Sequence, residues 1–67
     1  MNLTVNGKQE NIEKVEKLAD LLGELKIGEE KGFAIAINEE VVFRNSWQQT
    51  SLKDGDRVEI IRATQGG

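Results

Sequence analysis

The last two residues, Gly66 and Gly67, are the part of this sequence whose type and position allow chemistry. Glycine has no Cβ, so a Gly-Gly end can enter a channel too narrow for other residues and adopt backbone angles closed to them. There it would present its own α-carboxylate to a partner. The alternative is a frayed chain end, because terminal residues are often disordered and glycine permits disorder.

Composition narrows the class of protein. The chain has 67 residues, 37% of them apolar and 31% charged, which is ordinary for one small soluble domain over residues 1–67. No apolar run approaches the roughly 18 residues of a membrane span. The net charge of −3, with nine Lys and Arg spread among twelve acids, argues against a nucleic-acid partner. We expect a cytoplasmic protein without a signal peptide, membrane contact or bound cofactor, and a monomer when alone.

The elements that position the chain end begin with a hairpin. Residues 1–6 alternate apolar and polar side chains, which predicts a half-buried strand. Asn6-Gly7 is a strong signal for a tight type I′ turn. A second, polar edge strand is therefore predicted over residues 8–12.

A change of period after Glu13 predicts a helix. The apolar stripe consists of Val15, Leu18, Ala19, Leu22 and Leu25, widened by Leu21. Two acid–base pairs at i,i+4 spacing, Glu10 with Lys14 and Glu13 with Lys17, would support it where helical. Asn11 is the only nearby residue of a preferred capping type, and Gly28 is predicted to close the helical segment.

Two further strands follow. In residues 33–37 the bulky Phe33, Ile35 and Ile37 share one face, which predicts a strand. Residues 38–40 form a tight connection to a fourth, antiparallel strand over residues 41–44. The sequence leaves open which face of that strand is buried.

The segment between residues 45 and 53 is polar apart from Trp47 and Leu52, which we expect to anchor it against the core. The alternative for Trp47 is a platform for a ligand. Asp54-Gly55-Asp56 predicts a turn before the last strand. Its two carboxylates also allow the start of a calcium loop, although the other spaced ligands are absent.

The last strand leads into the tail. If Val58 and Ile60 face the core, Ile61 lies on the outer face with Arg57, Glu59 and Ala63. Residues 63–67 are expected to form a flexible tail, which spans roughly 17 Å when extended. An exposed isoleucine beside such a tail suggests a docking surface, although a lone exposed apolar side chain needs no explanation.

The predicted order of strand, strand, helix and three strands gives an α+β fold with one helix across one face of a mixed four- to five-stranded sheet. This is also the order of the ubiquitin-like β-grasp. The sequence resembles the ThiS family of sulfur carrier proteins of thiamine biosynthesis in a set of motifs taken together: residues 15–18 (VEKL), 36–38 (AIN) and 41–42 (VV), then Arg44, Trp47, Leu52, the 54–56 turn (DGD) and Gly66-Gly67. It departs at Phe43, where relatives commonly have proline, and at Gln65, where they often have a small or apolar residue.

The resemblance implies that other proteins act on the tail. In this family an E1-like adenylyltransferase of the ThiF type uses Mg-ATP to adenylate the carboxylate of the terminal glycine, here Gly67. Sulfur from a cysteine-desulfurase persulfide then replaces AMP, and thiazole synthase of the ThiG type consumes the thiocarboxylate. Activation is chemically necessary, because a carboxylate is a poor electrophile. The tail residues Ala63, Thr64, Gln65 and Gly66, together with Ile61, are the expected partner contacts.

The chain itself is not expected to be an enzyme. It has no cysteine, no histidine and no Gly-rich phosphate loop, so it lacks a thiol, the commonest general base and an ATP site. Two related functions stay open from sequence. One is the small subunit of molybdopterin synthase, which delivers sulfur to a pterin precursor, and the other is a ubiquitin-like modifier that forms isopeptide bonds.

Overall fold

The computed structural model describes residues 1–62. The candidate residues Ala63, Thr64, Gln65, Gly66 and Gly67, and with them the expected flexible tail, lie outside the described residues. Within residues 1–62 the strands are β1 (Asn2–Val5), β2 (Lys8–Asn11), β3 (Phe33–Ile37), β4 (Glu40–Val42) and β5 (Arg57–Arg62), joined by the helix α1 (Leu18–Glu24) and the short 3-10 helix η1 (Arg44–Ser46).

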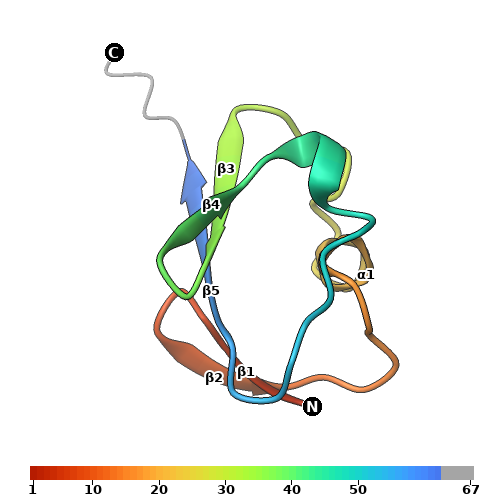
Figure 1. The fold of residues 1–67 in the computed structure, drawn as a ribbon, viewed down its shortest axis with the longest axis vertical. Helices are drawn as coiled ribbons and strands as arrows, with labels where there is room; N and C mark the ends of the chain where they lie inside the picture. Colours follow the sequence, from red (N-terminus) through yellow and green to blue (C-terminus); the bar gives the residue numbers. More distant parts are fainter. Residues whose placement is uncertain (63–67) are drawn as a thin grey trace.

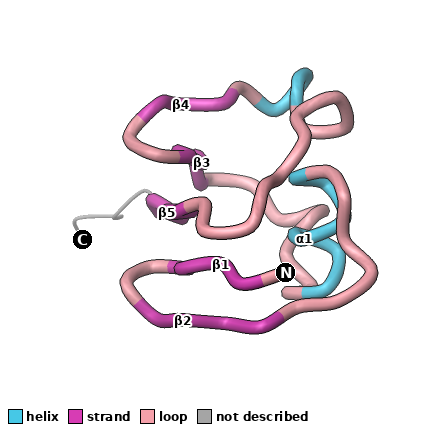
Figure 2. Tube along the Cα trace, turned by 60° about the horizontal axis from the view of Figure 1, so that its bottom comes forward, coloured by secondary structure: helices cyan, strands magenta, loops and turns pink. Residues whose placement is uncertain are grey.

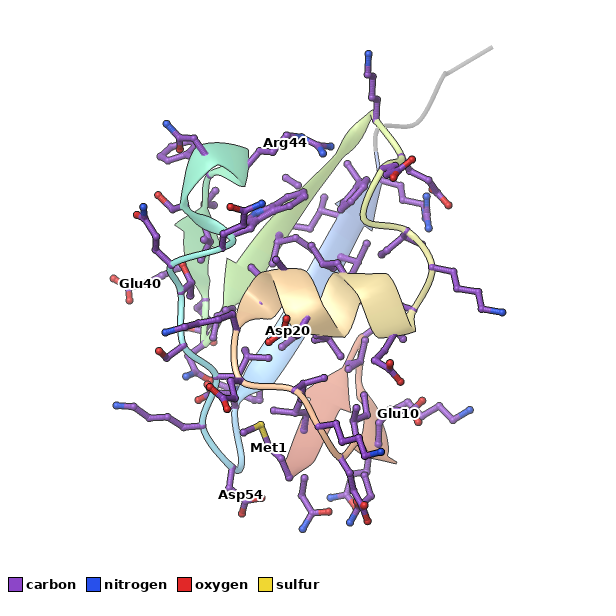
Figure 3. The ribbon with its side chains drawn as sticks, turned by 90° about the vertical axis from the view of Figure 1, so that its right-hand side faces the viewer. Met1, Glu10, Asp20, Glu40, Arg44 and Asp54 are labelled. Atoms are coloured by element: carbon purple, nitrogen blue, oxygen red, sulfur yellow. The ribbon has the colours of Figure 1, made fainter. Side chains whose placement is uncertain are left out.

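The strands of the described chain form one mixed sheet in the order β2-β1-β5-β3-β4. β1 and β5 run parallel in its middle, and the other neighbours are antiparallel. Figure 2 shows the strands stacked in this order, and Figures 1 and 3 show α1 lying across one face of the sheet. The predicted α+β fold class is confirmed. Within residues 1–62, α1 and η1 fall short of the length and hydropathy of a transmembrane helix.

The β1–β2 hairpin forms as predicted. Asn6 and Gly7 both have positive φ, 51° and 81°, which the type I′ turn requires. β1 places Leu3 in the core, where it is 2% exposed. The alternation of the first residues therefore identified the correct buried face.

α1 begins later than the apolar spacing predicted. The helix was expected from Glu13, but it begins at Leu18, and Lys14 has a left-handed backbone with φ of 67°. The residues between β2 and α1 carry the chain from the edge of the sheet to the face that the helix covers. The pairs Glu10 with Lys14 and Glu13 with Lys17 therefore lie before the first residue of the helix and do not support it.

Asp20 caps the start of α1. Its carboxylate accepts hydrogen bonds from the backbone N–H groups of Lys17, at 2.9 Å, and Glu16, at 3.1 Å. These bonds stabilise the charged form, so they lower the pKa of the Asp20 carboxyl below its ordinary value of 3.8. Asn11, the expected capping residue, instead ends β2.

Distant carbonyl groups complete the cap. The N–H of Leu18 donates to the carbonyl oxygen of Thr50 at 2.8 Å, and that of Ala19 donates to the carbonyl oxygen of Trp47 at 3.1 Å. The first N–H groups of a helix have no partner within the helix, so such acceptors fix where it begins. The segment after η1 therefore sets the start of α1.

Lys26 ends the helix in a left-handed conformation, with φ of 64°. Its N–H donates to the Gly23 carbonyl at 3.0 Å, and the N–H of Ile27 donates to the Leu22 carbonyl at 3.0 Å. This pair of bonds is a Schellman motif, in which glycine is the usual left-handed residue. The sequence predicted Gly28 for this role, but the helix ends before it and lysine occupies the strained position.

The β3–β4 connection is tighter than predicted. Asn38 and Glu39 both have positive φ, 51° and 75°, which gives a two-residue turn. Glu40, expected in the connection, instead pairs with Ile37 as the first residue of β4.

The register of this hairpin determines which face of β4 is buried. Val42 packs against the core, whereas Val41 is 57% and Phe43 73% exposed. The strand predicted over residues 41–44 ends at Val42, because Arg44 already belongs to η1.

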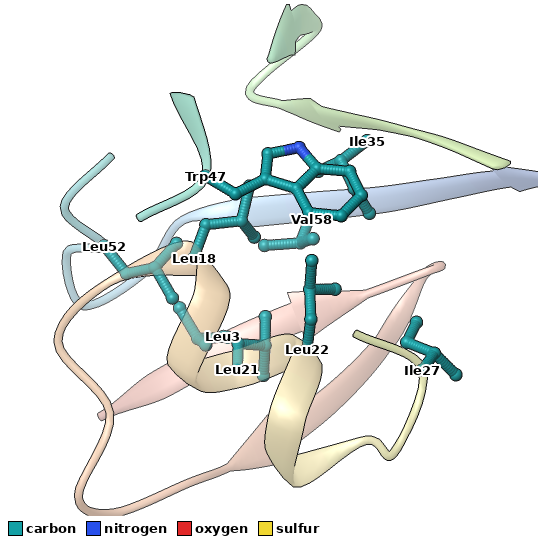
Figure 4. Close-up of a cluster of buried hydrophobic side chains, with 9 residues drawn as sticks. All are labelled: Leu3, Leu18, Leu21, Leu22, Ile27, Ile35, Trp47, Leu52 and Val58. Carbon is teal, nitrogen blue, oxygen red and sulfur yellow. The ribbon is translucent and has the colours of Figure 1, made fainter. Parts of the chain in front are cut away.

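The core lies between α1 and the sheet. Its buried side chains are Leu3, Leu18, Leu21, Leu22, Ile27, Ile35, Trp47, Leu52 and Val58 (Figure 4). Trp47 is 5% exposed and its Nε1 donates to the Val42 carbonyl at 2.9 Å, which satisfies the polar atom of a buried indole. The anchoring role predicted for Trp47 and Leu52 is confirmed.

The predicted turn over residues 54–56 is also confirmed, with Gly55 at φ of 91°. Asn38 joins it to the β3–β4 turn, because its Nδ2 donates to Asp56 Oδ1 at 3.0 Å and its Oδ1 accepts from Arg57 N at 3.0 Å. The carboxylate of Asp56 therefore serves as a structural acceptor. Among the described residues, no three His, Cys, Asp or Glu side chains gather as metal ligands.

Candidate functional site

The end of β5 leads directly into the candidate diglycine segment. Val58 is buried and Ile60 packs against the core on the same face, whereas Ile61 is 51% exposed. Neighbouring side chains of a strand point to opposite faces, so Ile61 lies on the face away from α1. The predicted strand phase is correct.

Two other large apolar side chains are exposed on the outer face that carries Ile61. Val41 and Phe43 are also exposed, and the register pairs Ala34 with Ile61 and Ala36 with Val41. The alanines of β3 therefore lie between the larger side chains of β4 and β5. Phe43 has an extended backbone, so alternation places it on the same side as Val41. We call Val41, Phe43 and Ile61 the outer apolar patch.

A hollow of about 570 Å³ at the end of the β3–β5 pair adjoins this patch. Its lining residues are Lys31, Gly32, Phe33, Ala34, Arg44, Ile61 and Arg62. Three of these side chains are cationic, in a chain whose net charge is −3. Figure 3 shows Arg44 at the end of the molecule where β5 ends. We call this region the basic hollow.

Arg44 is fixed in place by two kinds of contact. Its Nη2 donates to the Glu30 carbonyl at 2.7 Å and its Nη1 to the Gly28 carbonyl at 3.5 Å. Its guanidinium carbon lies 4.5 Å from the ring centroid of Trp47 and 5.5 Å from that of Phe33. Arginine stacks on aromatic faces in this way while keeping its charge.

Arg62 joins the same cluster from β5. Its Nη1 donates to Glu30 Oε1 at 2.7 Å, and its guanidinium carbon lies 5.8 Å from the Phe33 ring centroid. The side chains of this ion pair are 56% and 46% exposed, so its effect on stability is small. Its consequence is geometric: Glu30 binds Arg44 through its carbonyl and Arg62 through its carboxylate, which orients both cations.

The exposed side chains around the end of β5 are of types that suit recognition of a partner. The outer apolar patch can bury apolar surface against a partner, and the basic hollow can meet negative charge. Ile61 of the patch and Arg62 of the hollow are the last two residues of β5, the strand that leads to residues 63–67.

A mixed sheet with a central C-terminal strand and one helix across its face defines the ubiquitin-like β-grasp class of small proteins. Within this class the chain belongs to the ThiS family, whose model matches residues 3–67.

The most informative solved structures are similar over the whole chain. The crystal structure of a thiamine biosynthesis protein (ThiS) from Geobacter metallireducens has a TM-score of 0.84 and 38% identity, with 100% of both chains covered. The solution structure of a thiamine biosynthesis protein from the same organism has a TM-score of 0.77 and 38% identity, over 100% of this chain and 88% of the other. A thiazole synthase from Paramagnetospirillum magneticum is 36% identical over 67 residues, and the chain spans 20% of its length.

The structure describes one of the six predicted site residues. It places Ile61 on the outer face, while the other five candidate residues, 63–67, lie outside the described part. Sequence reasoning missed Val41 and Phe43 as neighbours of Ile61, and it missed the contact between Arg62 and Glu30. Two-residue turn geometry at residues 38 and 39 would have placed Val41 outward.

Proposed function

We propose that this protein is a sulfur carrier for thiazole formation in thiamine biosynthesis, and that Gly67 is the residue that carries the sulfur. The observation that supports this most strongly is the ThiS family match, which extends through residue 67. The similarity to a thiamine biosynthesis protein over the whole chain favours this pathway over molybdopterin synthesis and over protein modification.

The proposed reaction has two stages. A carboxylate oxygen of Gly67 attacks the α-phosphate of ATP on the activating enzyme, which releases pyrophosphate and leaves an acyl adenylate. The terminal sulfur of a protein persulfide then displaces AMP, and a thiol cleaves the resulting acyl disulfide to leave the thiocarboxylate. Activation is needed because the carboxylate charge is delocalised over two oxygens, which makes its carbon a poor electrophile.

The chain contributes position, and its partners contribute the catalysis. Mg-ATP belongs to the E1-like adenylyltransferase, and the persulfide to a cysteine desulfurase. Thiazole synthase is the proposed acceptor, which is supported by the sequence similarity to a protein of that name. The outer apolar patch around Ile61 is the proposed docking surface, because three exposed apolar side chains on neighbouring elements suit a partner interface.

The test is conversion of the whole chain in vitro. Wild type is incubated with the activating enzyme, Mg-ATP, a persulfide donor and a thiol, and the intact protein is weighed. It is expected to gain the mass difference between sulfur and oxygen. A form with one alanine added after Gly67 is the matched control, because the extra residue displaces the reactive carboxylate by about 3.5 Å, while attack needs atoms within roughly 3 to 3.5 Å. Equal conversion of both forms would contradict a role for the terminal diglycine.

A further inference from the structure

The basic hollow differs in charge from the chain that surrounds it. Lys31, Arg44 and Arg62 line it and one carboxylate, that of Glu30, contacts it through an ion pair, whereas the whole chain carries −3. A local excess of one sign of charge attracts the opposite sign and speeds encounter with a complementary surface. The complementary surface is therefore acidic.

The hollow also has an apolar side. Ile61 and Ala34 line it on the outer face of the sheet, where Ile61 is shared with the outer apolar patch, whereas the Phe33 ring lies on the α1 face against Arg44 and Arg62. An inorganic anion would gain nothing from these apolar walls. A protein surface that presents an apolar side chain flanked by carboxylates would contact both parts.

On the basis of the proposed function, we propose that the basic hollow is the electrostatic docking site for an acidic surface of the activating enzyme, and that an apolar side chain of that enzyme packs on Ile61 and Ala34 beside the cations. The arginines are already oriented for this contact. Arg44 is held by the Glu30 and Gly28 carbonyls, and Arg62 by the Glu30 carboxylate. Fixed side chains lose less conformational entropy on binding.

Arg62 can serve two carboxylates at once. Its contact with Glu30 uses Nη1, at 2.7 Å, and a guanidinium group carries five N–H donors in a planar fork. A carboxylate of the enzyme can therefore bind without breaking the contact that orients the side chain. The pair with Glu30 is more than half exposed on the Arg62 side, so an incoming group can reach it.

The position of the hollow gives docking a consequence for the reaction. Arg62 is the last residue of β5, and five residues separate it from the chain end. An extended segment of that length spans roughly 17 Å. Docking at the hollow therefore sets how far the Gly67 carboxylate reaches into the enzyme.

The experiment compares three charge reversals in the whole chain. Lys31→Glu and Arg62→Glu change the hollow. Arg57→Glu is the matched control, because Arg57 lies at the other end of β5, is 61% exposed and forms a similar ion pair with Glu39 at 3.8 Å. Calorimetry measures the Kd of each form for the adenylyltransferase of the same organism, at about 50 mM and about 500 mM salt. Thermal unfolding checks each fold, and Lys31→Gln and Arg62→Gln replace any reversal that does not fold.

At low salt each hollow variant is expected to raise Kd about tenfold, and the difference shrinks at high salt because the attraction is screened. Arg57→Glu is expected to stay within about twofold of wild type. Equal effects of all three reversals, or none from the hollow variants, would overturn the docking site. So would AMP shifting the NMR signals of the hollow in the free chain, because that result points to a phosphate site.

The same samples separate the two proposals. If the wild type gains sulfur while the hollow variants bind and convert like it, the docking site is wrong and the carrier function stands. If the wild type binds with the expected salt dependence but never gains sulfur, the carrier function is wrong while the acidic contact remains.

Discussion

The two ends of β5 are held very differently. At its start Val58 is paired on both sides, with Val5 in parallel and with Ile37 in antiparallel register. Near its end the parallel pairing has stopped, and the side chain of Asn6 takes its place by accepting from Ile60 N at 2.7 Å. Arg62 is paired with β3 alone among the neighbouring strands.

This contrast shows how one strand serves two purposes. The start of β5 is locked between two strands and under α1, so it carries stability. The end of β5 exposes Ile61 and Arg62 beside the segment that leads to Gly67, so it carries recognition. The predictions below separate these two purposes.

The largest effect on stability is expected at Val58, near the start of β5. Val58→Asp buries an unpaired carboxylate at a position that is 1% exposed, which costs about 4 kcal/mol or more. A small domain has only about 5 to 15 kcal/mol in total, so we expect loss of most of the folded population. Circular dichroism on heating measures it, and a cooperative transition at the wild-type temperature would contradict the assignment of Val58 to the core.

Replacement by aspartate is expected to have a different result at Ile61, near the exposed end of β5. Ile61→Asp is expected to change stability by no more than about 0.5 kcal/mol, because the side chain is on the surface. It is expected to raise the Kd for the activating enzyme about tenfold, since a charge replaces an apolar contact. Thermal unfolding and calorimetry measure the two effects. Collapse of the thermal transition would place Ile61 in the core.

A smaller effect, an increase in stability, is expected from a substitution at the end of α1, away from Ile61 and Arg62. Lys26 occupies a left-handed position at the end of α1, where glycine avoids a cost of about 1 kcal/mol. Lys26→Gly is expected to stabilise the fold by up to that amount, or about 4 to 8 °C in Tm for a domain of this size. Conversion by the activating enzyme is expected to be unchanged. A lower Tm would show that the left-handed lysine is favourable here.

The smallest effect concerns pH and the cap of α1. Hydrogen bonds from Lys17 N and Glu16 N lower the pKa of Asp20 below 3.8 in the folded state. The stabilisation of the fold by the Asp20 carboxylate is therefore fully present above pH 3.8. It is lost as the pH falls through the lower pKa that this carboxyl has in the folded state. Asp20→Asn is expected to be less stable than wild type near neutral pH, and this difference in the free energy of unfolding is expected to shrink as the pH falls below 3.8. Urea unfolding at several pH values measures this, and a gap that widens in acid would contradict the sign.

Most strands and their buried faces, with β4 the exception, could be predicted from the sequence because they depend on local patterns. Alternation in residues 33–37 and the Asn6-Gly7 turn gave correct strands, and the apolar stripe gave the helix face. The start of α1 could not be predicted, because its acceptors are the carbonyls of Trp47 and Thr50, about thirty residues away.

The candidate site divides in the same way. Strand alternation placed Ile61 outward, but the neighbours of Ile61 come from β4, whose register depends on a turn with two non-glycine residues at positive φ. The basic hollow joins residues of the 28–32 loop, β3, η1 and β5, which are brought together only by the tertiary fold. No local pattern in the sequence contains that information.

The most direct test of the carrier function is the intact mass of this protein isolated from its own cells during thiamine limitation. We predict a fraction in which one oxygen of the Gly67 carboxylate is replaced by sulfur, and which reverts to the carboxylate on incubation with thiazole synthase and its substrates. A ladder of conjugates joined to other proteins through the terminal glycine, with no sulfur-containing form, would contradict the account.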